Sequence, residues 1–221
     1  MLIRIFFVFL FLHSLATSGI AQIHYKLGVT SGVNVSSLKS DLFNTSSGRI
    51  APVIGCSFVV SWHEQFELNQ EIVLAFKGAQ ARAVYFRPEQ KPEEHTYAYH
   101  YNTFETAIFG GYRPGRDVPL FLQAGAYLGA NFHSLDREER ELMIADYQDI
   151  NNAIRAVDLN DAFAGLEFGP VVGITAGDGR FRASARYYMG IRNLYNYLDF
   201  VAAGPHIRTN SLRLSLTYFL R

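Results

Sequence analysis

The chain has 221 residues, of which 49% are hydrophobic and 14% aromatic, and its 20 Lys and Arg residues balance 20 Asp and Glu residues. This length suits one sizeable domain, and the lack of net positive charge excludes bulk electrostatic attraction to nucleic acid. The single cysteine, Cys56, excludes a disulfide framework within the chain.

The N-terminus carries the pattern of an export signal. Arg4 precedes an apolar run over residues 5–12, and small residues follow between positions 18 and 21. The alternative is a retained membrane helix, which is disfavoured because a helical span needs about 20 apolar residues. We therefore predict a cleaved signal peptide over residues 1–21 and one exported domain over residues 22–221.

Eight segments of the exported domain alternate between bulky apolar residues and small or polar ones with a period of two, which is typical of β-strands. In chain order they are Tyr25–Leu38, Ile50–Trp62, Glu67–Gly78, Tyr101–Tyr112, Leu120–Ala130, Ala162–Ala176, Phe181–Leu194 and Ser211–Arg221. Pro170 lies inside the sixth segment. Because proline cannot donate to a strand ladder, we predict a bulge or a local irregularity there.

The connections between these segments are expected to alternate in length. Long ones run over Lys39–Gly48, Gly78–His100, Asn131–Asp161 and Asn193–Thr209, and short ones over His63–Phe66, Arg113–Pro119 and Gly177–Arg180. Outer-membrane barrels have tight periplasmic turns and longer extracellular loops, so this pattern favours such a barrel. Within the longest connection, apolar residues over 137–157 are partly consistent with a short amphipathic helix.

The two faces of the strands distinguish a membrane barrel from a soluble one. One face is bulky and aliphatic in nearly every segment, whereas the charged face is also rich in Gly, Ser and Ala. An eight-stranded barrel has an interior only just wide enough for side chains, so the second set suits the interior. We predict an all-β fold, an eight-stranded antiparallel up-and-down transmembrane β-barrel over residues 22–221, integral to a bacterial outer membrane and surrounded by its lipid. Aromatic residues near strand ends would form the interfacial belts, namely Tyr25, Trp62, Tyr112, Tyr187 and Tyr218.

Charged residues on the inward face must be paired, because an isolated charge is costly to remove from water. We predict a structural lumen charge network formed by Lys26, Glu71, Lys77, Glu105, Glu167, Arg182, Arg186 and Arg213. In it, arginines from the last two strands would meet carboxylates from the third, fourth and sixth. For Lys77 and Arg182, which lie near strand ends, a solvated position at a barrel rim remains equally consistent with the sequence.

Few residues suggest catalysis or metal binding. The candidates, His95, His100, His133, Ser134 and His206, all fall in the predicted outer loops and show neither a triad order nor close ligand spacing. We predict no catalytic residues, no cofactor and no metal site. A filled lumen disfavours a wide pore, which leaves a structural or interaction barrel whose loops, such as residues 87–101, meet a protein or small-molecule ligand. Two alternatives remain: a secreted soluble lipocalin-like barrel for a small apolar ligand, and a narrow pore.

Four segments resemble the outer-membrane β-barrel family that includes PorT and is common in Bacteroidetes. They are "LGVTSGVNVSSL" in the first strand, "ELNQEIVLAFKGA" in the third, "FLQAGAYLGA" in the fifth and "ARYYMGIRNL" in the seventh. Their order and spacing together carry the resemblance. It implies a barrel in the outer membrane and, as for PorT itself, an association with protein secretion, and it implies no catalytic residue.

Overall fold

The computed structural model describes residues 24–40, 46–85, 93–115, 118–132, 143–145, 154–155, 165–177, 179–194 and 207–220, so the predicted signal peptide lies outside the described residues. All regular structure in this part of the chain is β-strand. The strands are β1 (His24–Ser40), β2 (Ser46–His63), β3 (Phe66–Tyr85), β4 (Glu93–Tyr112), β5 (Leu120–Phe132), β6 (Met143–Ala145), β7 (Ile154–Arg155), β8 (Leu166–Ala176), β9 (Phe181–Met189) and β10 (Ile207–Phe219).

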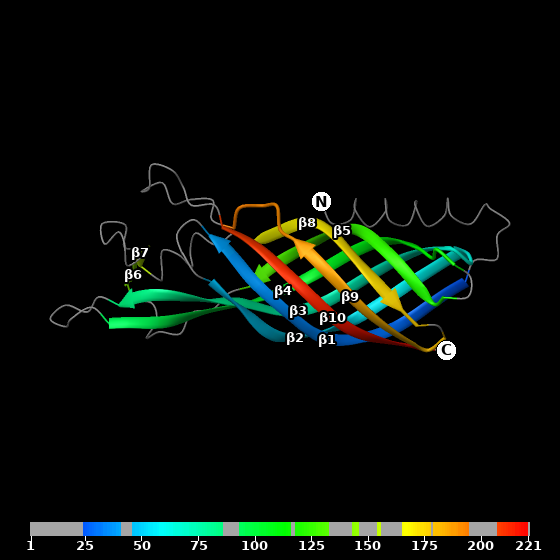
Figure 1. Cartoon of the computed structure of the whole chain (residues 1–221), viewed down its shortest axis with the longest axis horizontal. Coiled ribbons are helices and arrows are strands. Elements are labelled where there is room, and N and C mark those ends of the chain that lie inside the picture. The colour runs from blue at the N-terminus through cyan, green and yellow to red at the C-terminus, as the bar shows by residue number, and fades with distance from the viewer. Residues whose placement is uncertain are drawn as a thin grey trace.

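Eight of these strands close into an antiparallel barrel (Figure 1). The order around the wall is β2-β1-β10-β9-β8-β5-β4-β3, and a further pairing of β2 with β3 completes the cylinder. The short strands β6 and β7 pair with each other, and β6 pairs with the far end of β3. Closure leaves no free edge within the barrel, so the backbone groups in the wall have partners where water is absent. The predicted fold class is confirmed.

The stagger of the strands sets the width of the barrel. A line of paired residues that leaves β1 at Lys26 passes once around the wall and returns to β1 at Ser36, ten residues further along. Eight strands with such a stagger tilt by about 40° to the axis and leave an interior that side chains just fill. Inward residues from opposite strands are therefore forced into contact.

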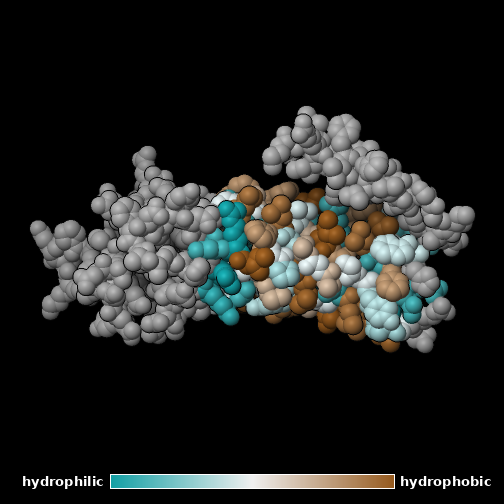
Figure 2. All heavy atoms as spheres, turned by 90° about the horizontal axis from the view of Figure 1, so that it is seen from above, coloured by the Kyte–Doolittle hydropathy of each residue, from teal (hydrophilic) through white to brown (hydrophobic). Residues whose placement is uncertain are grey.

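Side chains alternate across the wall as the sequence predicts. Leu214 is 46% exposed, whereas its neighbour Arg213 is 1% exposed. Brown, hydrophobic side chains cover much of the outer surface of the barrel in Figure 2, and teal, hydrophilic ones gather toward its ends. A soluble lipocalin-like barrel requires the reverse arrangement and is excluded. The five predicted belt aromatics, Tyr25, Trp62, Tyr112, Tyr187 and Tyr218, are all exposed on the outer face.

The short connections lie at one end of the barrel together with both described chain ends. They are the β2–β3 turn at residues 64–65, the β4–β5 connection at 113–119 and the β8–β9 turn at 177–180. We call this end periplasmic and the opposite end extracellular, following the arrangement common to outer-membrane barrels.

Two predicted long connections are partly strand. The pairing of β3 with β4 continues from Gly78 and His100 out to Tyr85 and Glu93, and only residues 41–45 join β1 to β2. The predicted strands were too short because the outer face of a strand need not be apolar beyond the bilayer. There the alternation of apolar and polar residues is lost, although the hydrogen-bond ladder continues. His95 and His100 therefore lie on β4 and not in a loop.

The predicted helix over residues 137–157 is wrong where the structure describes this segment. Residues 143–145 and 154–155 are the strands β6 and β7, with Ile144 opposite Ile154. The ladder that β6 forms with the projecting end of β3 supplies partners for its backbone groups and favours the extended conformation. The seventh predicted strand is also too long, because β9 ends at Met189.

No bulge occurs at Pro170, but the regular pairing of β8 with β9 is interrupted there, which is a local irregularity of the kind predicted. The register of β5 and β8 passes this residue without a shift. The missing N–H is tolerated because the β8–β9 ladder begins only at the next residue, Val171. Register shifts occur in β2, with one extra residue between Gly48 and Val53 and another between Ser61 and His63.

Leu216→Arg is expected to lower the free energy of unfolding by about 2 to 4 kcal/mol, because it places a guanidinium in hydrocarbon near the middle of the outer face of β10. Urea titration of protein refolded into lipid vesicles measures the loss. Leu220→Arg, on the same face at the periplasmic end, is the matched control and should cost at most about 1 kcal/mol. Equal losses would contradict the membrane depth assigned to this face.

Candidate functional site

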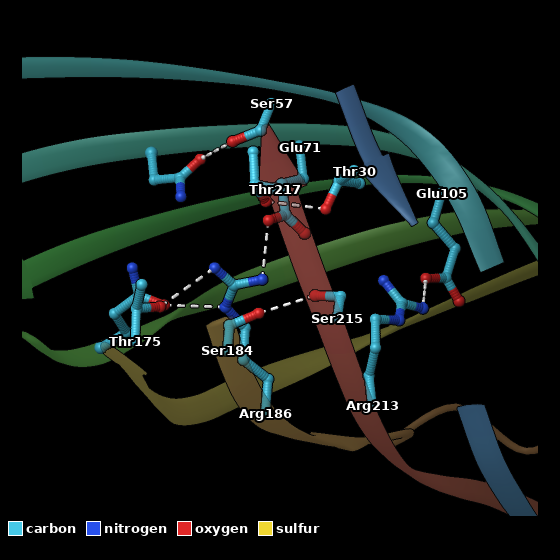
Figure 3. Close-up of polar contacts among 12 residues, drawn as sticks. Thr30, Ser57, Glu71, Glu105, Thr175, Ser184, Arg186, Arg213, Ser215 and Thr217 are labelled. Carbon is cyan, nitrogen blue, oxygen red and sulfur yellow. Dashed lines mark hydrogen bonds and ion pairs between the residues drawn. The ribbon is translucent and has the colours of Figure 1, made fainter. Parts of the chain in front are cut away.

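The charged side chains of the lumen come from two opposing walls. The described parts of β1, β2, β9 and β10 carry lysines and arginines but no Asp or Glu. The lumen carboxylates stand on β3, β4 and β8. In Figure 3, arginine side chains rise from β9 and β10 toward carboxylates on the other side of the barrel. The ion pairs of these arginines therefore cross the lumen and link strands that are not neighbours in the wall.

A first group of residues, the periplasmic cluster, consists of Arg182, Arg186, Glu67, Glu71 and Gln123. Arg182 Nη1 lies 2.6 Å from Glu67 Oε2, and Arg186 Nη1 lies 2.7 Å from Glu71 Oε1. Gln123 joins the two pairs: its Oε1 accepts from Arg186 Nε at 2.7 Å, and its Nε2 donates to Glu67 Oε1 at 3.3 Å. All five side chains are buried.

A second group, the extracellular cluster, consists of Lys77, Glu105, Glu167 and Arg213. The Lys77 ammonium contacts the carboxylates of both Glu105 and Glu167. Arg213 contacts Glu105 from the opposite wall and donates to the Tyr188 hydroxyl at 2.9 Å. Each cluster thus combines two cations with two carboxylates and carries no formal charge, which is the condition for burying charge without a prohibitive desolvation cost.

Aromatic rings fill the lumen beside the clusters. Tyr127 and Tyr188 pack edge to face with ring centres 5.3 Å apart, and both join a buried apolar group with Phe109. The guanidinium of Arg186 lies 4.5 Å from the centre of the Phe109 ring, and that of Arg213 lies 4.1 Å from the Tyr188 ring. These cation–π contacts stabilise the arginines where water is excluded.

Cations and rings also alternate across the periplasmic mouth. The Arg182 guanidinium lies between Phe121, at 4.9 Å, and Phe219, at 5.5 Å from the ring centres. The Arg113 guanidinium lies 5.8 Å from the centre of the Phe121 ring, and the Lys26 ammonium lies 5.9 Å from the centre of the Phe219 ring. This stack draws on β1, β5, β9, β10 and the β4–β5 connection, so cations and rings from five elements gather at this end of the lumen.

Glycines on the inward face make room for the long charged side chains. A Cβ atom on Gly111 would lie 2.7 Å from Glu67 Cγ, and one on Gly173 would lie 2.6 Å from Arg186 Cγ. Both distances are too short for carbon atoms. The small residues that mark the charged face in the sequence are thus a steric condition for the ion pairs.

Seven of the eight predicted network residues are buried in the lumen and contact a charge of opposite sign: Glu71, Lys77, Glu105, Glu167, Arg182, Arg186 and Arg213. Lys26 is half-buried at the periplasmic mouth, outside both clusters. Lys77 and Arg182 are only 1% and 5% exposed, so neither sits at a solvated rim. Glu167, on β8, contacts a lysine and not one of the arginines.

Sequence reasoning missed Glu67, Gln123 and Thr175 as members of the network. Thr175 Oγ1 donates to Gln123 Oε1 at 2.7 Å. Glu67 could have been found, because it shares the inward parity of Asn69 and Glu71 on the same strand. The roles of Gln123 and Thr175 could not have been predicted, because their hydrogen-bond partners lie on other strands.

The candidate catalytic side chains do not assemble in the described part of the chain. His100 is exposed on β4 and contacts the Arg49 guanidinium. His133, Ser134 and His206 lie outside the described residues. No group of three or more His, Cys, Asp or Glu side chains that could hold a metal ion occurs among the residues described.

A closed barrel with an apolar outer face and a neutral, ion-paired lumen defines an integral membrane β-barrel. Nowhere in the described residues is there a helix long and apolar enough to cross a bilayer. Residues 20–196 match the family described as outer membrane protein beta-barrel domain. The chain belongs to this family and is an integral protein of the outer membrane. The comparison with curated protein sequences gives no match.

Several solved structures share the general architecture at low sequence identity. Ail of Yersinia pestis, solved in complex with the heparin analogue sucrose octasulfate, is 10% identical over 89% of this chain and 99% of its own, with a TM-score of 0.42. Neisserial surface protein A is 10% identical over 87% of this chain and 96% of its own, with a TM-score of 0.44. OprG of Pseudomonas aeruginosa is 8% identical over 91% of this chain and 96% of its own, with a TM-score of 0.40.

Arg186→Met is expected to lower the free energy of unfolding by about 3 to 5 kcal/mol, because it leaves the Glu71 carboxylate buried without its partner. The double variant Arg186→Met/Glu71→Met should lose much less, since no charge is left uncompensated. Urea unfolding in vesicles measures both.

Arg180→Met, in the exposed β8–β9 turn, is the matched control and should change stability by less than about 0.5 kcal/mol. Strictly additive losses in the double variant would show that the two side chains are not coupled.

Proposed function

We propose that this protein is a non-enzymatic outer-membrane barrel of structural and interaction type, with a lumen closed to solutes. The observation that carries the proposal is the filled lumen. The stack around Arg182 occupies the periplasmic mouth. The periplasmic and extracellular clusters, with their neighbouring rings, occupy the lumen from there toward the extracellular end. A large diffusion pore would require a continuous wide water path, and an eight-stranded wall leaves little room for one.

The extracellular end of the barrel supports an interaction role. β3 and β4 are each 20 residues long, whereas about 9 to 11 residues suffice to cross a bilayer. Their ladder continues to Tyr85 and Glu93, beyond Asn102, where the described pairing of β4 with β5 begins. Figure 1 shows this hairpin projecting past the rest of the barrel. A projecting element on a rigid scaffold is well placed to meet a ligand or partner protein.

Two finer assignments rest on the sequence. Residues 1–21 are the proposed cleaved signal peptide, and N-terminal sequencing of the purified protein tests this boundary at Gln22. Within its family the chain is proposed to group with the PorT-like members and to act as an accessory to secretion, on the strength of the four ordered motifs. Unimpaired secretion by cells lacking the protein would refute that role.

In planar-bilayer recordings, the refolded protein is expected to give little or no steady current, because paired charges and rings occupy the lumen. Large, regular conductance steps would overturn the closed-lumen proposal, and small regular ones would favour the narrow pore. Heat-modifiable gel mobility of the same sample establishes that the barrel is folded.

A photo-crosslinking residue at Thr96, on the projecting part of β4, is expected to give a discrete adduct in intact cells. The same residue at Gln65, in the β2–β3 turn at the opposite end, is the control and should not give that adduct. Identical patterns from both positions, or no adduct from Thr96, would contradict an interaction role for the hairpin.

A further inference from the structure

Two cations stand directly opposite each other on neighbouring strands at the extracellular edge. Lys39 of β1 is paired in register with Arg208 of β10, and both side chains are exposed. Like charges opposite each other destabilise a strand pair. A third cation, Arg192, lies just beyond β9, where the Gly190 amide donates to the carbonyl of Thr209, the residue after Arg208. We call Lys39 and Arg208 the cationic rim; Arg192 continues the inward parity of the buried Tyr188 and Gly190 and is not part of it.

The rim belongs to the wall that lacks carboxylates. Inside the barrel the cations of this wall are neutralised by glutamates across the lumen, but Lys39 and Arg208 alternate with the buried Leu38 and Thr209 and lie on the outer face. The described parts of β1, β2, β9 and β10 offer them no Asp or Glu. Arg49, on β2, contacts His100 and the Lys77 carbonyl, which supply no formal negative charge when the imidazole is neutral.

The position of the rim indicates the depth of its ligand. On the outer face of β1 and β10 the apolar band ends at Val35 and Leu212, which are paired in register, and Lys39 and Arg208 follow four residues further out. With a rise of about 3.3 Å per residue and a tilt of about 40°, they lie about 10 Å beyond the hydrocarbon edge. The headgroup layer extends about 5 to 7 Å beyond the hydrocarbon, and the long side chains of Lys39 and Arg208 can reach back into it.

We propose that the cationic rim binds the phosphate of a phosphorylated lipid headgroup in the outer leaflet. The guanidinium of Arg208 and the ammonium of Lys39 can both donate hydrogen bonds to one phosphate, whose negative charge offsets the repulsion between the two cations. A lipid is favoured over a soluble polyanion because these two side chains lie on the same outer face as the lipid-facing Val35 and Leu212 and stand beside the bilayer. The proposal concerns the wall of the barrel and is independent of any partner at the β3–β4 hairpin.

The test uses diphosphoryl lipid A as the probe. Protein folded in a phosphate-free maltoside detergent is titrated with this lipid, and the lipid retained per barrel is measured by native mass spectrometry. Relative to wild type, Arg208→Ser should weaken retention about fivefold and Lys39→Ser/Arg208→Ser about thirtyfold, given the usual contribution of one basic residue near an anionic lipid surface. Raising the salt concentration should weaken retention by the wild-type protein in the same direction.

Arg180→Ser removes an exposed arginine at the periplasmic end and should leave retention unchanged. Heat-modifiable mobility shows whether each variant is folded, and the salt dependence of the wild-type protein does not rely on any variant. Equal retention of dephosphorylated lipid A, or equal loss in Arg180→Ser, would overturn the proposal. Binding of heparin that depends on Lys39 and Arg208, without retention of lipid A, would instead assign the rim to a soluble polyanion.

Discussion

Backbone groups within a bilayer find no water, so every strand of this protein must have two neighbours. Pairing of β1 with β10 and of β2 with β3 meets that condition by closing the wall. The stagger of ten residues between Lys26 and Ser36 then leaves a narrow interior. Closure and stagger together bring side chains from opposite walls into contact, and the lumen chemistry follows from that proximity.

The arginines and carboxylates of the lumen stand on different walls, so their charges neutralise each other only once the barrel is closed. The lumen arginines stand on β9 and β10, whereas the carboxylates stand on β3, β4 and β8. Until the walls face each other, each carries unpaired charge that is costly to bury. Lys77 is the exception, since it stands on the carboxylate wall and bridges Glu105 and Glu167. The cationic rim lies on the outer face of β1 and β10 and therefore has no partner among the lumen glutamates.

Several features could be predicted because they depend only on residues close in sequence. The period of two identified all eight barrel strands and the face of each residue, including the inward direction of Arg186 and Glu71. The extracellular ends of β3 and β4 could not be located, because these strands extend where neither face must be apolar. The helix predicted over residues 137–157 was wrong at Ile144 because the far end of β3 supplies a strand partner that local spacing does not reveal.

The sequence by itself determined the sidedness of the barrel and the set of charges that had to be buried, because alternation and residue size are local properties. Only the tertiary structure decided which charges meet: that Arg186 contacts Glu71, that Lys77 bridges two carboxylates, and that Arg182 lies between Phe121 and Phe219. The strand register brought Lys39 opposite Arg208. Pairings of this kind depend on the stagger around the closed wall, and no single strand encodes it.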